Sequence, residues 1–113
     1  MSEKRALRFV RSIQGATVYD PLSVRIGTIE RLLIDPGTWR VRVLLVSFDI
    51  PGVSGEPLPL PWRVIQYSAD ADRFFTLVTK TQLSHAPRYD ETAAEAAGWE
   101  ERLLGHYNVT HVE

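Results

Sequence analysis

The amino-acid sequence predicts a mainly β fold, a small barrel of about six short strands followed by a C-terminal helix. Short runs of β-branched and aromatic residues alternate with clusters of Pro, Gly and Asp through most of the chain. Prolines at alternate positions of one run indicate a strand at the edge of a sheet. After residue 90 the spacing of the apolar residues changes to that of a helix.

Length and composition limit the class of protein. The chain has 113 residues, 44% of them hydrophobic, and its 13 basic and 14 acidic residues give a net charge of -1. This size predicts one domain with its own core. The absence of cysteine excludes disulfides, thiolate metal sites and cysteine nucleophiles. The near-neutral charge provides no overall attraction to nucleic acid or to anionic membranes.

The first half of the barrel is predicted from three strands. A short strand at Thr17–Tyr19 is followed by a longer one at Ile26–Ile34, in which Gly27 indicates a bulge or a tight bend. The segment Asp35–Thr38 has Pro and Gly at the two central positions that a type II turn prefers. The next strand, Arg40–Phe48, therefore forms a hairpin with the strand before it.

The strand at Arg40–Phe48 has an unusual pattern. Alternate residues point to opposite faces, with Val41, Val43 and Leu45 on one face and Arg40, Arg42, Leu44, Val46 and Phe48 on the other. From Leu44 onward both faces are apolar, although a strand in a small barrel needs only its inner face buried. We expect the C-terminal helix of the same chain, or a second chain, to cover Leu44 and Val46.

The second half of the barrel begins with the proline-containing edge strand Leu58–Trp62. We expect the aromatic side chains of Trp62, Tyr67 and Phe75 to pack in the core. The remaining predicted elements are strands at Arg63–Tyr67 and Arg73–Val78, and a single helical turn at Lys80–His85.

A helix is predicted near the C-terminus. Thr92 and Glu95 have the spacing of a capping box that opens a helix. Gly98 weakens or kinks this helix, and Gly105 is expected to end it. A helix this short needs tertiary packing, so its apolar stripe must dock on another surface. The stripe consists of Ala96, Trp99, Leu103 and Tyr107.

The predicted organisation is a barrel over residues 1–89, beginning with a short basic arm, and a helix with an acidic tail over residues 90–113. Four basic residues oppose one acidic residue in the arm, whereas six acidic residues oppose one basic residue after residue 89. The longest apolar run, Val43–Val46, is far too short to span a membrane, and no secretory signal is present. We therefore expect a cytoplasmic protein without a membrane span.

The residue types that carry catalysis or bind metals show no convincing arrangement. The segment around Ser54 lacks the spacing of a nucleophile elbow, and no phosphate-binding glycine motif is present. Asp70 and Asp72 are spaced as in a calcium loop, but the rest of that pattern is missing. The histidines His85, His106 and His111 do not have the spacing of a shared metal site. The sequence predicts no catalytic residue, no cofactor and no metal site.

A nucleic-acid surface is a weaker possibility. Trp39 at the hairpin turn is placed to stack on a base. The arginines Arg25, Arg31, Arg40 and Arg42 would form a basic strip across the hairpin. Arginines also commonly coat the solvent face of a barrel, and the chain is slightly acidic overall, so nucleic-acid binding is the less favoured interpretation.

Several short motifs follow one another along the chain: Val18-Tyr19-Asp20, Ile26-Gly27-Thr28-Ile29-Glu30, Leu33-Ile34-Asp35-Pro36, Arg40-Val41-Arg42 through Leu45-Val46-Ser47-Phe48, Leu60-Pro61-Trp62, Tyr67, Phe75-Thr76-Leu77, Gln82-Leu83 and Ala86-Pro87. Their order and spacing together resemble the PRC-barrel domain family. The resemblance covers roughly Phe9 to Tyr89. It implies a small β-barrel of the kind found in the photosynthetic reaction-centre H subunit, in a ribosome maturation factor and in stand-alone bacterial and archaeal proteins. The shared role that it implies is protein–protein interaction, with no catalytic residue to carry over.

The leading functional hypothesis is a non-catalytic interaction or adaptor module that self-associates as a homodimer and binds an unknown protein partner. Its candidate partner-binding residues are Leu44, Val46, Trp99, Leu103 and Tyr107. The alternative is an RNA- or ribosome-associated adaptor that uses the basic arm and the arginine-coated hairpin.

Overall fold

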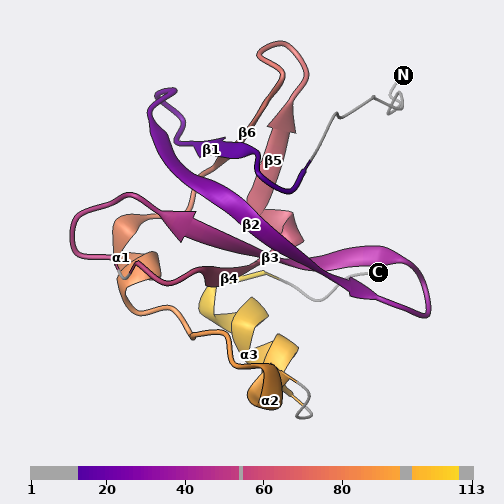
Figure 1. The fold of residues 1–113 in the computed structure, drawn as a ribbon. Coiled ribbons are helices and arrows are strands. Elements are labelled where there is room, and N and C mark those ends of the chain that lie inside the picture. The colour runs from indigo at the N-terminus through magenta and orange to yellow at the C-terminus, as the bar shows by residue number, and fades with distance from the viewer. Residues whose placement is uncertain (1–12, 54, 95–97, 110–113) are drawn as a thin grey trace.

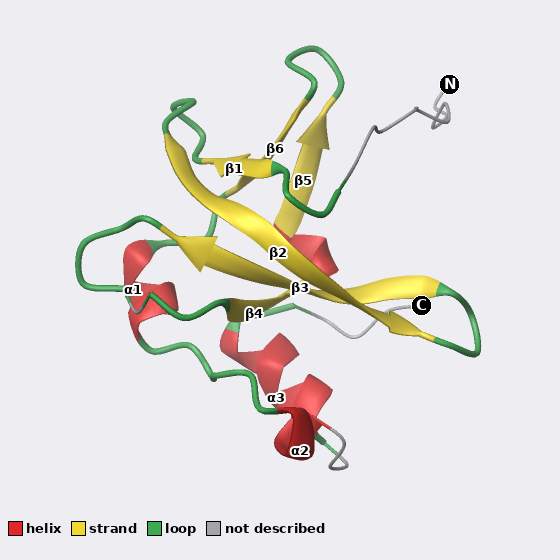
Figure 2. Ribbon diagram, in the orientation of Figure 1, coloured by secondary structure: helices red, strands yellow, loops and turns green. Residues whose placement is uncertain are grey.

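The computed structural model describes residues 13–53, 55–94 and 98–109. These residues form one curled six-stranded sheet, with three short helices gathered near one of its edges (Figures 1 and 2). The basic arm predicted at the N-terminus and His111 lie outside the described residues. The elements are β1 (Thr17–Tyr19), β2 (Arg25–Asp35), β3 (Arg40–Phe48), β4 (Leu58–Pro61), the 3-10 turn η1 (Trp62–Val64), β5 (Ile65–Ser68), β6 (Arg73–Thr76), α1 (Lys80–Ser84), α2 (Glu91–Ala94) and α3 (Trp99–His106).

The strand order in the sheet is β4-β3-β2-β1-β6-β5. All neighbouring strands pair antiparallel except β1 and β6, which pair parallel. The two edge strands, β4 and β5, follow each other in the chain and are joined by η1, so the sheet must curl to bring its ends together. The mainly β fold with a C-terminal helix is confirmed.

The irregularity predicted near Gly27 is present. Val18 of β1 lies opposite Gly27 and Tyr19 lies opposite Arg25, so one extra residue of β2 is accommodated beside the glycine. Gly27 also sits against β3, because a Cβ at this position would lie 2.6 Å from the backbone oxygen of Ser47. Close packing of the two strands therefore requires a residue without a Cβ at position 27.

The hairpin between β2 and β3 is confirmed, but its predicted turn type is wrong. Gly37 does not have the positive φ that a type II turn needs at this position. Instead the backbone oxygen of Asp35 accepts from the N–H groups of Thr38 and Trp39, and Trp39 takes the left-handed conformation with φ 62°. The Asp35 carboxylate accepts from the Gly37 N–H at 2.8 Å, which stabilises this turn.

The C-terminal helix differs from the prediction at both ends. Asp90, and not Thr92, accepts the hydrogen bond at the start of α2, from the Thr92 N–H at 2.9 Å. Gly98 has φ 87° and is the N-cap of α3, so a helix begins after it and does not continue through it as the predicted kinked helix would. Glu95 and Ala96 lie outside the described residues.

The end of α3 is formed by Asn108 and not by Gly105, which lies inside the last turn. Asn108 has φ 58° and donates its N–H to the oxygen of Gly105, and Val109 donates to the oxygen of Leu104 at 2.9 Å. These two bonds make a Schellman motif, in which asparagine tolerates the left-handed position almost as glycine does.

Smaller differences concern the second half of the sheet. The turn predicted before Pro87 is α1, opened by a capping box between Thr79 and Gln82 that the sequence analysis did not identify. β4 ends at Pro61 and β6 ends at Thr76, both earlier than predicted. As a result Trp62 and Leu77, which follow these strands, are exposed.

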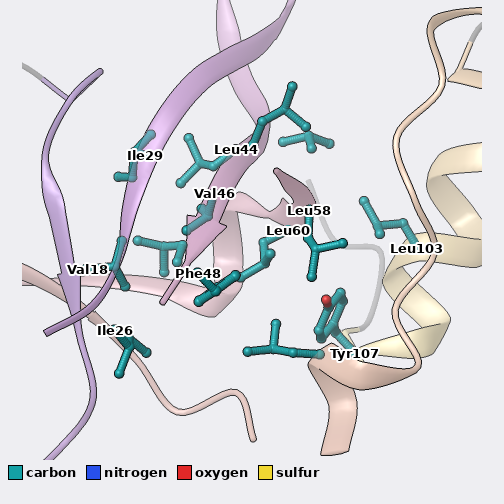
Figure 3. Close-up of a cluster of buried hydrophobic side chains, with 14 of the residues drawn as sticks. Val18, Ile26, Ile29, Leu44, Val46, Phe48, Leu58, Leu60, Leu103 and Tyr107 are labelled. Atoms are coloured by element: carbon teal, nitrogen blue, oxygen red, sulfur yellow. The ribbon is translucent and has the colours of Figure 1, made fainter. Parts of the chain in front are cut away.

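The core includes both faces of β3. Val43, Leu44, Leu45, Val46 and Phe48 are all buried and belong to one hydrophobic cluster. Register places Leu44 opposite Leu60 and Val46 opposite Leu58. Figure 3 shows this face of β3 and β4 together with Leu103 and Tyr107 from the end of the chain, so the C-terminal helix completes the core of its own barrel.

Replacing Gly27 with Ala is expected to destabilise the fold by about 1–3 kcal/mol, because the added methyl group would overlap the backbone of β3. Chemical denaturation would measure this change. The matched control is Gly55→Ala, where the new Cβ meets nothing within 4 Å. Equal stabilities of the two variants would contradict the proposed close approach.

Leu103→Ala is expected to lower the free energy of unfolding by about 2–5 kcal/mol, since Leu103 is 0% exposed in the core cluster. Leu22→Ala is the control, because Leu22 is 83% exposed and its truncation should change stability by no more than about 0.5 kcal/mol. Thermal denaturation distinguishes the two. A stable Leu103→Ala variant would mean that α3 does not dock on the barrel in solution.

Candidate interaction surface

The five candidate partner-binding residues lie in the interior of one chain. Leu44 and Val46 belong to β3, and Trp99 and Leu103 belong to α3, with Tyr107 directly after it. All five are buried and join a single hydrophobic cluster. The α3 residues belong to the same core cluster as Leu44 and Val46, and α3 packs against β4, the strand beside β3.

A partner-binding role for these five residues stays a prediction. Their burial means that a partner would reach them only if α3 left its barrel. Asp substitutions at Val46 or Trp99 would bury an unpaired charge and unfold the chain, so they do not test an interface.

Arg42 connects the hairpin with the C-terminal helix. Its guanidinium lies 3.3 Å from the Asp35 carboxylate in the hairpin and 2.9 Å from the Glu100 carboxylate in α3. Glu100 stands in the first turn of α3, where a negative charge also interacts favourably with the helix dipole. The predicted basic strip therefore loses one of its four arginines to an internal ion-pair network.

The other end of α3 is held by a second polar contact. Nε2 of His106 donates to the backbone oxygen of Gln82 in α1 at 2.7 Å. The His106 ring also stands edge-on to the ring of Tyr107, with 4.7 Å between ring centroids. His85, by contrast, interacts through Nδ1 with the backbone oxygen of Thr81 in its own helix. His85 and His106 thus make hydrogen bonds with different partners and do not form one shared site.

Tyr107 is the least satisfied buried polar side chain of this region. Its hydroxyl is buried and has no hydrogen-bond partner among the described residues. Burial raises the pKa of Tyr107 well above its usual value of 10.0, because the phenolate would be desolvated. A phenylalanine ring at position 107 would therefore pack in the core as well as the tyrosine ring does.

Three arginines of the predicted basic strip remain on the surface. Arg25, Arg31 and Arg40 are exposed on β2 and β3. Trp39, at the tip of the same hairpin, is 76% exposed. The hairpin thus presents one aromatic ring beside exposed positive charge.

Some exposed apolar side chains were missed by sequence reasoning. Trp62 was expected in the core, yet it is 46% exposed and its ring lies under the guanidinium of Arg63, 4.9 Å from the ring centroid. Proline at the end of β4, directly before it, was the available signal that the strand stops there. Besides Trp39 and Trp62, the large hydrophobic residues exposed in the described chain are Leu22, Val24, Ile34 and Leu77.

The described part of the chain contains neither a metal-binding cluster nor a membrane-spanning helix. In residues 13–53, 55–94 and 98–109, no three His, Asp or Glu side chains come together as a group able to hold a metal ion. None of the helices in those segments has the length and apolar character needed to cross a membrane.

Tyr107→Phe is expected to leave stability at neutral pH unchanged or to raise it by about 1 kcal/mol, because the variant lacks the unsatisfied hydroxyl. In the native protein the raised pKa of Tyr107 favours the neutral form in the folded state. The tyrosine of the unfolded chain ionises near pH 10, whereas the buried tyrosine stays neutral. The folded state therefore keeps its full stability below pH 10 and loses stability as the pH rises further. Urea denaturation at neutral pH and above pH 10 should show a smaller alkaline loss in the variant. A clear destabilisation of Tyr107→Phe at neutral pH would show that the hydroxyl has a partner.

Comparison with known proteins agrees with this fold. No curated protein sequence matches the chain. The family model for the PRC-barrel domain matches residues 7–83, close to the span from Phe9 to Tyr89 expected from the sequence motifs. The match ends within α1, so α2 and α3 lie beyond the matched residues. The chain belongs to the PRC-barrel domain family.

Proposed function

We propose that this PRC-barrel chain is a non-catalytic, cytoplasmic protein-interaction module that associates with a second copy of itself and presents its β2–β3 hairpin to another protein. The family supports an interaction role over a catalytic one, because protein–protein interaction is the role that the resemblance implies. The proposal rests on Trp39, the exposed residue at the tip of this hairpin.

Trp39 occupies a position that local structure does not explain. It has φ 62°, a conformation that glycine or asparagine adopts at low cost and that a bulky side chain rarely adopts. The cost of such a conformation, about 1–3 kcal/mol, is normally offset elsewhere in the structure. Here the ring is 76% exposed and gains little from burial in its own chain.

A partner surface would account for Trp39. Tryptophan is enriched among the residues that dominate binding energy at interfaces, because one ring buries a large area with few rotatable bonds. Figure 1 shows the turn between β2 and β3 projecting away from the rest of the sheet, where another protein can reach it. Nearby Ile34 is also exposed and would extend the apolar contact.

The alternative function, an RNA- or ribosome-associated adaptor, uses the same tip. Trp39 would stack on a base, and Arg31 and Arg40 would contact phosphates. Two facts weigh against it: Arg42 is already paired with Asp35 and Glu100, and the chain has a net charge of -1. We therefore rank protein binding first.

Trp39→Gly separates binding from folding. The variant should be as stable as the wild type or more stable, because glycine adopts the required conformation freely. It should also capture the protein partner at least about tenfold less well in an affinity pull-down from cell extract.

The control for this pull-down is nuclease treatment of the extract, which should leave capture by the wild-type chain unchanged. Equal capture of the same partners by wild type and Trp39→Gly would refute a binding role for the tip. Capture that disappears with nuclease, and also with Arg40→Ala, would replace the proposal with the RNA alternative.

A further inference from the structure

The two edges of the sheet are protected to different degrees. β4 contains Pro59 and Pro61, both fully buried, and α3 packs against this strand. β5, at the other edge, has the sequence Ile-Gln-Tyr-Ser and pairs only with β6 among the described strands. It contains neither the proline nor the charged residue that natural proteins commonly place on an open edge. β5 is thus the edge at which another strand can be added.

We propose that β5 pairs antiparallel with β5 of a second copy across a two-fold axis, joining the two curled sheets. This inference rests on the self-association in the proposed function and names its surface. A two-fold arrangement places the same strand on both sides of one interface, so a single set of contacts occurs twice.

The register of such a pair is restricted by backbone geometry. In an antiparallel ladder, residues that exchange hydrogen bonds lie opposite each other, and along one strand only alternate residues point outward. In a pair of identical strands related by a two-fold axis, the numbers of any two opposite residues therefore add up to an even number. An axis at Gln66 meets this condition and sets Ile65 opposite the second copy's Tyr67, so apolar side chains meet on one face. The exposed Gln66 side chains meet on the other face.

The charges at the two ends of β5 are complementary in this arrangement. Arg63 is exposed just before the strand, and Asp70 is exposed in the turn after it. With the axis at Gln66, Arg63 of each copy lies opposite the second copy's Ala69, next to Asp70, so the long Arg63 side chain can reach that carboxylate and two Arg–Asp pairs form. Asp72 in the same turn already accepts a hydrogen bond from the Tyr67 hydroxyl, so Asp70 is the acid that we assign to this contact.

Trp62 would contribute apolar area at the same place. Its ring is partly exposed and supports the Arg63 guanidinium from one side. In the paired form, the turn after β5 of the second copy would lie against this Trp62–Arg63 pair. The exposure of a tryptophan that the sequence placed in the core then has a physical reason.

Light scattering across a micromolar concentration range tests the edge. Wild type is expected to reach twice the mass of one chain. Gln66→Lys should weaken the dimer by about tenfold or more, because two like charges would face each other on the axis. Arg31→Glu, at an exposed site of β2, is the control and should leave the dimer unchanged.

A charge exchange gives the sharper test. Arg63→Glu alone and Asp70→Lys alone would each place two like-charged pairs in the homodimer and should each weaken it by about tenfold or more. An equimolar mixture of the two variants should dimerise again, because both pairs across the mixed interface are then attractive. Recovery on mixing also shows that both variants are folded.

The outcomes separate this inference from the proposed function. A wild-type dimer that persists in Gln66→Lys and in both charge variants would overturn pairing through β5 and leave self-association standing. Charge variants that dissociate but do not recover on mixing would overturn the Arg63–Asp70 contact. A wild-type chain that stays monomeric at all concentrations would overturn both self-association and the edge, while binding of another protein by Trp39 would be decided by the pull-down.

Discussion

The apolar character of both faces of β3 is the constraint on which the rest of the structure depends. Val43 and Leu45 face one way, Leu44 and Val46 face the other, and all four are buried. A curled sheet can shield one face of a strand by wrapping around it, but the other face needs a separate layer. The chain contributes Trp99, Leu103 and Tyr107 to the same core cluster from α3 and the residue after it, and α3 packs against β4.

Packing alone does not orient the helix, and polar contacts at its two ends complete its placement. Arg42 connects Glu100 at the start of α3 to Asp35 in the hairpin, and His106 at the end donates to the Gln82 backbone. Partly exposed ion pairs contribute modestly to stability, so these contacts set position more than they add free energy. The unpartnered Tyr107 hydroxyl shows that burial of its ring outweighed a lost hydrogen bond.

The same constraint explains where free surface remains. Covering β3 uses β4 and α3, so the edge formed by β4 is closed by two prolines and a helix. The edge at β5, which follows β4 through η1, and the projecting tip at Trp39 take no part in that contact. Among the described residues, the domain therefore has one edge covered by prolines and a helix, a second edge at β5 and an exposed aromatic tip at Trp39.

The sequence by itself determined the mainly β fold, the β2–β3 hairpin, the irregularity at Gly27 and the need for a cover over Leu44 and Val46. These features follow from local propensity and from side-chain alternation, which are properties of neighbouring residues. The identity of the cover, the exposure of Trp62, the left-handed Trp39 and the Asn108 cap were decided by the tertiary structure. Each depends on where strands stop and which distant segment reaches a given face, and burial of the core settles that choice against weaker local preferences.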